Sequence, residues 1–396
     1  MLCPVPGKER ETAVPAQKEA LWELPAVLSD QEERMCRPGN IFLTGCTGYL
    51  GSYILKKLLE YGSEKMYCLV RGGVGRLGGS MNYYFGAGYL DKYKERLYAF
   101  DGELTAEQFQ ADPCVYEEMV HSVTRIFHCA ADVRHYAPEE ELINTNVEGT
   151  RQVLRFAEAS GAAVMYISTI SVAGMQTART KEQGAVLSEK DLNIGQNWWE
   201  NPYVKSKIMA EKLVDDAVRR GLGANIFRIG RLVSSSFDGI FQKNPESNAF
   251  YRLIKGVIEL GMLPEILYHQ RLEVTPVNLA AEAVVRLSKT TKSAYHICSP
   301  HKIEIGCLAE ACKAVQITDA ETFAGTLKEK SMRSESPYIQ ALAQTWFELQ
   351  NREAEVVPDT AFTQKTLAAL DFWWPQPDIG KLKLCFTKEE GREERQ

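Results

Sequence analysis

The sequence predicts an α/β fold built on a doubly wound parallel sheet, with a smaller, mostly helical lobe towards the C-terminus. Short apolar segments of strand length recur along the chain, and segments with helical apolar spacing alternate with them. The first strand-like segment runs into three closely spaced glycines and then into a helix-like segment. Alternation of this kind is typical of βαβ units, whose strands lie parallel, so we expect a sheet of the Rossmann type.

Composition excludes several classes of protein. The 396 residues allow two or three domains, and a hydrophobic content of 45% is normal for a chain with a large core. A net charge of −6 argues against broad nucleic-acid binding, which requires a basic surface. The ten cysteines form no CxxC pair, which favours a reducing cytosol and no metal site. We find no signal peptide and no apolar run of membrane-spanning length, so we expect a cytoplasmic protein without membrane contact.

The glycine-rich turn near the N-terminus predicts a dinucleotide site. Asn40–Thr44 is predicted as a buried strand, and helical spacing continues over Tyr53–Tyr61. Gly45, Gly48 and Gly51 lie between them at intervals of three. Such a turn lets backbone N–H groups and a helix N-terminus approach a pyrophosphate. A plain glycine turn is the alternative, and the strand before and helix after argue against it.

A cation follows the second predicted strand, Met66–Val70. Arg71 lies about twenty residues past the glycines, where NAD-specific folds place an acid on the ribose hydroxyls. A guanidinium there suits a 2′-phosphate and favours NADPH over NADH, with Arg76 as a second contact. A solvated loop arginine is the alternative. The literal GxGxxG at Gly73–Gly78 opens no helical pattern, so we expect a flexible loop over Gly72–Gly88.

The third and fourth predicted strands end beside the expected cofactor. Leu97–Phe100 is followed by Leu104, near where the adenine ring is expected. Arg125–Cys129 runs into Ala130 and Ala131, whose small side chains would let the cofactor pass close over the strand end. Ordinary tight packing explains the same two alanines, and both explanations can hold together.

The fifth predicted strand brings hydroxyl groups to the same edge. A single helix is predicted over Glu139–Ser160, and the strand Ala163–Ile167 follows it. This strand delivers Ser168 and Thr169 at its carboxyl end, where open α/β sheets place their chemistry.

The next predicted helix carries a tyrosine and a lysine on one face. It begins at Asn201-Pro202, a capping residue followed by proline, and runs to Arg220. Tyr203 and Lys207 lie at i and i+4. An ammonium one turn away should lower the phenol pKa from about 10, so that Tyr203 can donate a proton to a developing oxyanion. Lys207 can also hold the nicotinamide ribose, and the Thr169 hydroxyl would complete the site.

These segments, taken in order, resemble a known enzyme family. The chain is similar to extended short-chain dehydrogenases/reductases, and more specifically to terminal thioester reductase domains of nonribosomal peptide synthetases and carboxylic acid reductases. The matching segments are LTGCTGYLG, CLVRG, HCAADVRHY, TNVEGT, YISTISVAG, PYVKSKIMAEKLV, FRIGRL, NAFYRLIKG, VTPVNLAAEAVVRLS and YHICSP, which together cover Asn40 to about Pro300.

The resemblance implies roles for individual residues. It implies 2′-phosphate binding by Arg71 and a catalytic trio of Thr169, Tyr203 and Lys207. It implies cofactor binding along the glycine turn by Thr44, Gly45, Thr47, Gly48, Tyr49, Leu50 and Gly51.

The resemblance also implies a reaction and a partner. In the family, NADPH reduces an acyl or peptidyl thioester on the phosphopantetheine arm of a carrier protein, which releases an aldehyde that some members reduce to an alcohol. No carrier-type phosphopantetheine serine motif is visible, so we expect the carrier to lie outside this chain. The alternatives are an extended reductase or epimerase acting on a nucleotide sugar, and a non-catalytic NADP-sensing module.

The expected organisation has four parts. Residues 1–37 form a linker or arm from an upstream carrier domain, and residues 388–396 form a solvated tail. Residues 38–236 form the NADP-binding domain, to which 271–300 return. Residues 237–270 and 301–387 form the substrate-binding lobe.

Overall fold

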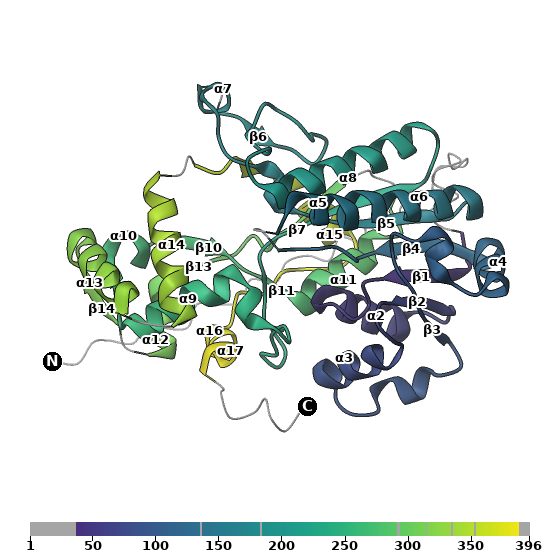
Figure 1. Cartoon of the computed structure of the whole chain (residues 1–396), viewed down its shortest axis with the longest axis horizontal. Helices are drawn as coiled ribbons and strands as arrows, with labels where there is room; N and C mark the ends of the chain where they lie inside the picture. Colours follow the sequence, from purple (N-terminus) through teal and green to yellow (C-terminus); the bar gives the residue numbers. More distant parts are fainter. Residues whose placement is uncertain are drawn as a thin grey trace, which may run out of the picture.

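A computed structural model describes residues 37–387, apart from 135–136, 183, 291–293, 314, 334–335 and 352–353. The expected tail and almost all of the expected N-terminal arm lie outside the described residues. At the centre is a seven-stranded sheet in which every neighbouring pair is parallel (Figure 1). Its order is β12 (Ala294–Ile297), β7 (Ala224–Ile229), β5 (Ala163–Thr169), β4 (Val123–His128), β1 (Asn40–Thr44), β2 (Met66–Val70) and β3 (Leu97–Asp101). The predicted Rossmann-type sheet is therefore confirmed.

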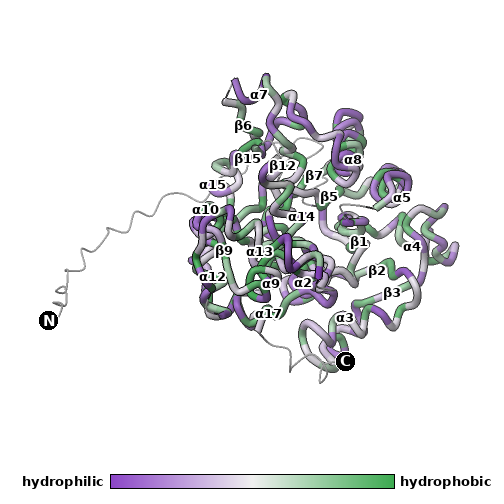
Figure 2. Tube along the Cα trace, turned by 60° about the vertical axis from the view of Figure 1, so that its left-hand side comes forward, coloured by the Kyte–Doolittle hydropathy of each residue, from purple (hydrophilic) through white to green (hydrophobic). Residues whose placement is uncertain are grey.

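Helices cover both faces of this sheet, as Figure 1 shows. The helices α2 (Tyr49–Tyr61) and α11 (Val277–Leu287) pack on one face; the opposite face carries α4 (Pro113–Ser122), α6 (Gly149–Ser160) and α8 (Pro202–Arg219). Along β1, Ile41 and Leu43 are buried towards the first set and Phe42 towards the second. Because both faces are covered, the strands are hydrophobic along most of their length (Figure 2).

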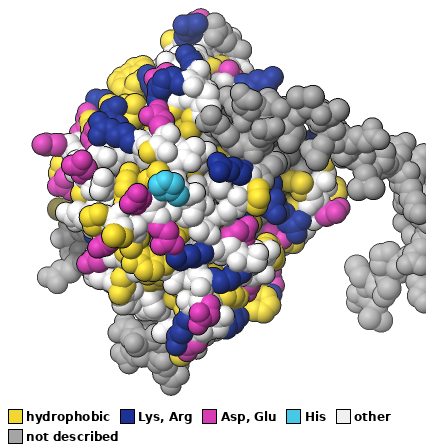
Figure 3. All heavy atoms as spheres, turned by 90° about the vertical axis from the view of Figure 1, so that its right-hand side faces the viewer, with side chains coloured by type: hydrophobic (Ala, Val, Ile, Leu, Met, Phe, Trp, Pro, Cys, Tyr) yellow, Lys and Arg dark blue, Asp and Glu magenta, His cyan; other side chains and the backbone are white. Residues whose placement is uncertain are grey.

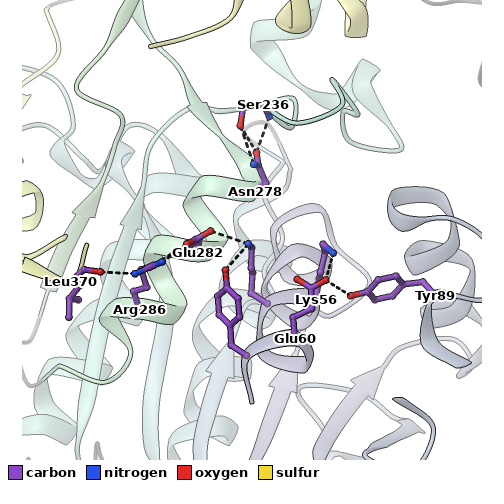
Figure 4. A network of polar contacts seen from close by, with 10 residues as sticks. Lys56, Glu60, Tyr89, Ser236, Asn278, Glu282, Arg286 and Leu370 are labelled. Carbon is purple, nitrogen blue, oxygen red and sulfur yellow. Dashed lines mark hydrogen bonds and ion pairs between the residues drawn. The ribbon is translucent and has the colours of Figure 1, made fainter. Parts of the chain in front are cut away.

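Ion pairs at the edge of the α2–α11 contact join the two helices. Glu282 of α11 accepts hydrogen bonds from Lys57 of α2 at 3.0 Å and from Arg286 at 2.8 Å, and Arg286 also donates to the carbonyl of Leu370 (Figure 4). This network lies on the sheet face opposite α8.

The predicted strands and the start of α8 are confirmed within two residues. Asn201 caps α8 through a hydrogen bond from the Val204 N–H at 3.1 Å, with Pro202 in the first turn. The helix predicted over Glu139–Ser160 is continuous but not uniform. Its middle, Asn144–Glu148, is a π-helical turn between α5 (Glu139–Ile143) and α6. π turns are rare and often lie at functional sites.

The predicted loop over Gly72–Gly88 is wrong in its central part, because Gly75–Phe85 forms helix α3. Leu77, Met81 and Tyr84 lie on one face of this helix and are 2%, 0% and 4% exposed. Glycine has low helix propensity, but burial of an apolar face outweighs it. The four- and three-residue spacing of these side chains was the helical signal that the glycines obscured.

A second, mostly helical core forms the lobe, on the left in Figure 1. Its helices are α9 (Ala249–Leu260), α10 (Glu265–Tyr268), α12 (Ile305–Cys312), α13 (Ala320–Arg333), α14 (Pro337–Asn351), α16 (Ile379–Leu382) and α17 (Leu384–Thr387). Two small sheets accompany them, β9 (Met262–Pro264) with β14 (Gln316–Thr318), and β10 (Arg271–Glu273) with β13 (Lys302–Glu304).

One stretch expected in the lobe lies against the central sheet instead. Helix α15 (Ala361–Ala369) and the segment after it bury Leu367, Phe372 and Trp374 in the same core as α11. These apolar side chains pack on the same face of the sheet as α11. Their position late in the chain did not indicate this long-range contact.

The remaining short elements are η1 (Tyr89–Tyr93), η2 (Glu107–Gln110), η4 (Ile170–Ala173), α7 (Ala178–Glu182), β6 (Val186–Leu187), β8 (Leu232–Val233), η5 (Pro245–Ser247), β11 (Thr275–Pro276) and β15 (Val357–Pro358).

Charges of both signs are mixed on one face of the molecule. On the face at the β3 edge of the sheet, Lys and Arg side chains are interspersed with Asp and Glu (Figure 3). Within the described residues, no helix combines the length and the apolar character needed to cross a membrane.

Replacing Gly79 with alanine should stabilise the protein, because Gly79 lies inside α3 with no atom near its missing Cβ. We expect a gain of about 0.5–1 kcal/mol in the free energy of unfolding, measured in urea. Gly86, which ends α3 at φ +93°, is the matched control, and Gly86→Ala should destabilise the protein. Equal effects of the two substitutions would contradict helix α3.

Candidate active site

The glycine turn forms a narrow cradle between β1 and α2. Gly45 has φ +73°, and a Cβ on it would lie 2.5 Å from the backbone nitrogen of Ala130. A Cβ on Gly51 would lie 2.1 Å from the carbonyl oxygen of Gly45. The first turn of α2 contains no acidic residue, and its N–H groups have no carbonyl within their own helix. Gly48, Tyr49 and Leu50 begin this helix, so the turn fits the pyrophosphate of a dinucleotide.

Buried hydrogen bonds hold β1 and β4 together at the point where the strand order reverses. The Thr44 hydroxyl lies 2.8 Å from His128 Nδ1 and accepts a bond from the Ala130 N–H at 3.3 Å. His128 Nε2 lies 3.1 Å from the Thr150 hydroxyl. Burial, and then the charge of Lys207, lowers the pKa of His128 to about 3, so the imidazole is neutral. Thr44 thus lies beneath the turn, while Ala130 and the half-buried Ala131 continue past it.

An open pocket of about 290 Å³ lies at the ends of β2 and β3, where sequence reasoning placed the adenine end of the cofactor. Arg71 is exposed at its edge, and Arg76 donates a hydrogen bond to the Arg71 carbonyl, so the two guanidinium-bearing residues lie together. Leu104 instead buries its side chain against Gly149 of α6. The full lining is Arg71, Gly72, Asp101, Gly102, Glu103 and Gln110.

Sequence reasoning missed two residues of this pocket. Asp101, the last residue of β3, accepts hydrogen bonds from the N–H groups of Gly72 and Gly73, both at 3.0 Å. Gln110 lines the same space from a turn nine residues further along the chain. The position of Asp101 at a strand end was a signal that could have identified it, whereas Gln110 reaches the pocket only through the fold.

The glycine turn also contacts more distant segments. The Tyr49 hydroxyl donates to the carbonyls of Val233 at 2.9 Å and Ile240 at 3.2 Å, on the segment that leads into the lobe. The Thr47 carbonyl accepts a hydrogen bond from Ser80 of α3 at 3.1 Å. Tyr49 therefore connects the start of α2 to the lobe through its side chain.

The three predicted catalytic residues lie together at the carboxyl edge of the sheet. Thr169 ends β5, and its hydroxyl is hydrogen-bonded to Tyr203 in the first turn of α8. Tyr203 is 7% exposed and Lys207 is 2% exposed. The Lys207 Nζ donates to the Ile167 carbonyl at 2.8 Å and lies 4.4 Å from the centre of the Tyr166 ring.

Burial, rather than the neighbouring ammonium, determines the ionisation of this site. Burial raises the pKa of Tyr203 to about 12, although the Thr169 hydroxyl lowers it and Asp132 raises it further. Burial lowers the pKa of Lys207 to about 7. The expected decrease in the phenol pKa is therefore wrong, because removal from water favours the neutral form of both groups. The Tyr203 phenol is protonated at neutral pH and can donate a hydrogen bond.

Among the described residues, no group of three or more His, Cys, Asp or Glu side chains is arranged to hold a metal ion.

Solved structures similar to this chain include reductase domains of peptide synthetases. A thiolation-reductase di-domain from an archaeal nonribosomal peptide synthetase is 27% identical with a TM-score of 0.80, covering 93% of this chain and 81% of that one. The terminal R domain from the myxalamid PKS-NRPS pathway is 25% identical with a TM-score of 0.74, covering 87% of this chain and 88% of that one.

Curated relatives are much longer than this chain. It is 30% identical over 325 residues to glycine betaine reductase ATRR of Emericella nidulans, an alignment that covers 76% of this chain and 25% of that protein. It is 31% identical over 285 residues to the nonribosomal peptide synthetase asaC of Aspergillus flavus, across 69% of this chain and 27% of that protein. The chain thus spans only about a quarter of the length of these two relatives.

The family comparison covers the glycine turn, the Tyr-Lys helix and most of α11. The NAD_binding_4 family, described as male sterility protein, matches residues 43–284. Together with the solved reductase domains, this match confirms the resemblance predicted from the sequence. Because the match extends over more than half of its length, the chain belongs to the male sterility protein family of NAD-binding domains.

Proposed function

We propose that this chain catalyses the NADPH-dependent reductive release of a carrier-bound acyl or peptidyl thioester as an aldehyde. One observation carries the proposal: at the carboxyl edge of a doubly wound sheet, Thr169 and Tyr203 are hydrogen-bonded, and the Lys207 ammonium, one turn along α8, binds the Ile167 carbonyl of the same strand as Thr169. That edge is where open α/β sheets bind dinucleotides. Relatives named as reductases and a similar structure that includes a thiolation domain support it.

In the proposed reaction, Tyr203 acts on the thioester carbonyl oxygen. The bound nicotinamide supplies a hydride to the carbonyl carbon. The protonated phenol donates its proton to the oxygen as negative charge develops there, and the Thr169 hydroxyl orients the phenol. The resulting thiohemiacetal collapses by losing the carrier thiol, which leaves the aldehyde. Lys207 would hold the nicotinamide ribose.

The preference for NADPH rests on the charges at the β2 end. Arg71 lines the pocket, and Arg76 binds the Arg71 carbonyl; a guanidinium at this place can bind a 2′-phosphate through two hydrogen bonds. The Asp101 carboxylate is engaged by two backbone N–H groups, so it has hydrogen-bond partners other than a ribose.

The proposed organisation assigns the cofactor, the substrate and the link to the carrier to different segments of the chain. Residues 237–270 and most of 301–387 form the lobe that receives the pantetheine-linked chain, and residues 38–236 with 271–300 hold the cofactor. Residues 1–37 form the arm that joins the reductase to an upstream carrier domain.

Removal of the Tyr203 hydroxyl should abolish turnover. With a panel of acyl- and aminoacyl-pantetheine thioesters, we expect the chain to oxidise NADPH, followed by absorbance and by product mass. Tyr203→Phe should lower kcat by about 10²- to 10⁴-fold because the proton donor is lost, and Lys207→Ala should also abolish activity. Tyr61→Phe, at an exposed tyrosine that ends α2, is the matched control and should leave turnover unchanged. Full activity of Tyr203→Phe would remove the assigned role.

Replacing Arg71 should alter the choice of cofactor. Arg71→Ala should weaken NADPH binding by about 10- to 100-fold, the loss of charge-assisted hydrogen bonds worth about 1.5–3 kcal/mol, and leave NADH binding nearly unchanged. Dissociation constants for both cofactors measure this directly. Arg219→Ala, at an exposed arginine that ends α8, is the control. If Arg71→Ala weakens NADPH and NADH equally, the 2′-phosphate assignment is wrong.

A further inference from the structure

The polar face of α8 continues one turn beyond Lys207. Tyr203, Lys207 and Glu211 lie at i, i+4 and i+8, so they follow one face of the helix. Glu211 is 0% exposed, and a carboxylate removed from water requires charged or hydrogen-bonding partners.

Two residues from the central sheet bind Glu211, and a third supports one of them. Arg228 of β7 donates through Nε to both carboxylate oxygens at 3.2 Å and through Nη2 at 2.9 Å. The Ser168 hydroxyl, at the end of β5, donates to the same carboxylate at 2.5 Å. On its other side, Arg228 lies 3.0 Å from Nε2 of His296 on β12. The His296 Nδ1–H donates to the Asp359 carbonyl, so Nε2 accepts from the guanidinium.

These contacts tie together the two segments that carry the active site. Ser168 directly precedes Thr169 on β5, and Glu211 shares helix α8 with Tyr203 and Lys207. The hydrogen bond from Ser168 to Glu211 therefore fixes the end of β5 against α8, one residue from the Thr169–Tyr203 hydrogen bond.

Glu211 also acts on the charge of Lys207. Its negative charge raises the pKa of Lys207, in opposition to the larger effect of burial. The other groups that face Lys207 are weaker partners for a cation. From β4 they are the neutral His128 and the Cys129 thiol, and from β5 the Tyr166 ring and the Ile167 carbonyl. Burial and the Arg228 charge likewise keep His296 neutral by lowering its pKa to about 4.

We propose that Glu211 is a positioning residue of the reductase site, which holds the Thr169 strand end against the Tyr203 helix and, one helical turn from Lys207, favours the ammonium form of that lysine. The inference rests on the proposed function, and it gives the Glu211 carboxylate a supporting role at that site. Arg228 and His296 hold this carboxylate in place and do not reach the reacting groups.

The first test measures NADPH binding and needs no thioester. The dissociation constant for NADPH should rise with pH as Lys207 loses its proton. Glu211→Gln keeps the shape of the side chain but removes its charge, so the midpoint of this rise should move down by about one pH unit. The variant should then bind NADPH about tenfold more weakly than the wild type at pH 8, and about twofold more weakly at pH 6. An unchanged midpoint would overturn the electrostatic role.

Glu282→Gln is the matched control for this test. Glu282 pairs with Lys57 and Arg286 on the opposite face of the sheet (Figure 4), so its loss should leave the midpoint unchanged. A shift as large as that of Glu211→Gln would indicate a general effect of removing a paired carboxylate and would also overturn the proposal.

A milder variant tests the positioning role if Glu211→Gln does not fold. Ser168→Ala keeps the ion pair with Arg228 but removes the link to β5. We expect a lower kcat for a pantetheine thioester, with an unchanged pH midpoint for NADPH binding. Unchanged kcat would overturn the positioning role. A wild-type chain that binds NADPH but reduces no thioester refutes the proposed function alone, because the binding test of Glu211 still applies.

Discussion

The site depends on the burial of one face of α8 against the carboxyl ends of β4 and β5. Removal from water disfavours charge on Tyr203 and Lys207 alike, so the phenol keeps its proton and the lysine titrates near neutral pH. A lysine in this setting needs compensating groups, and Glu211, the Ile167 carbonyl and the Tyr166 ring supply them. The helix therefore carries a protonated phenol and, one turn further on, a lysine with partners for its charge, the two groups that the proposed reduction uses.

The glycine turn and helix α8 are joined by a continuous buried network. Thr44 bonds His128, and His128 bonds Thr150. Thr150 donates to the Asn146 carbonyl in the π turn at 2.6 Å, and the Asn146 side chain donates to Ser206 of α8 at 2.9 Å. Every member has a partner, as buried polar groups require. The glycine turn and the Tyr-Lys helix are thus held in a fixed relation through side chains that do not themselves reach the reacting groups.

Local sequence signals made the sheet and the glycine turn predictable. The remaining features depend on long-range packing, which the sequence pattern does not reveal. The strands and the capped start of α8 follow from apolar patterns and from Asn201-Pro202. Helix α3 was missed because glycine propensity is a local quantity, while burial of Met81 depends on the whole fold. The i, i+4 spacing brought Tyr203 and Lys207 to one face, but spacing says nothing about burial, which reversed the expected pKa of the phenol. Arg228 and Ser168 meet Glu211 only because β5, β7 and α8 pack together.

The most direct test of the central claim follows the hydride to its product. The chain is incubated with a pantetheine thioester and NADPH deuterated at the transferring position of the nicotinamide, and the aldehyde is trapped and weighed by mass spectrometry. We expect deuterium on the aldehyde carbon, which was the carbonyl carbon of the thioester, and one free thiol released for each aldehyde formed. A carboxylic acid formed without NADPH consumption, or an aldehyde without deuterium, would contradict hydride transfer at the site of Thr169, Tyr203 and Lys207.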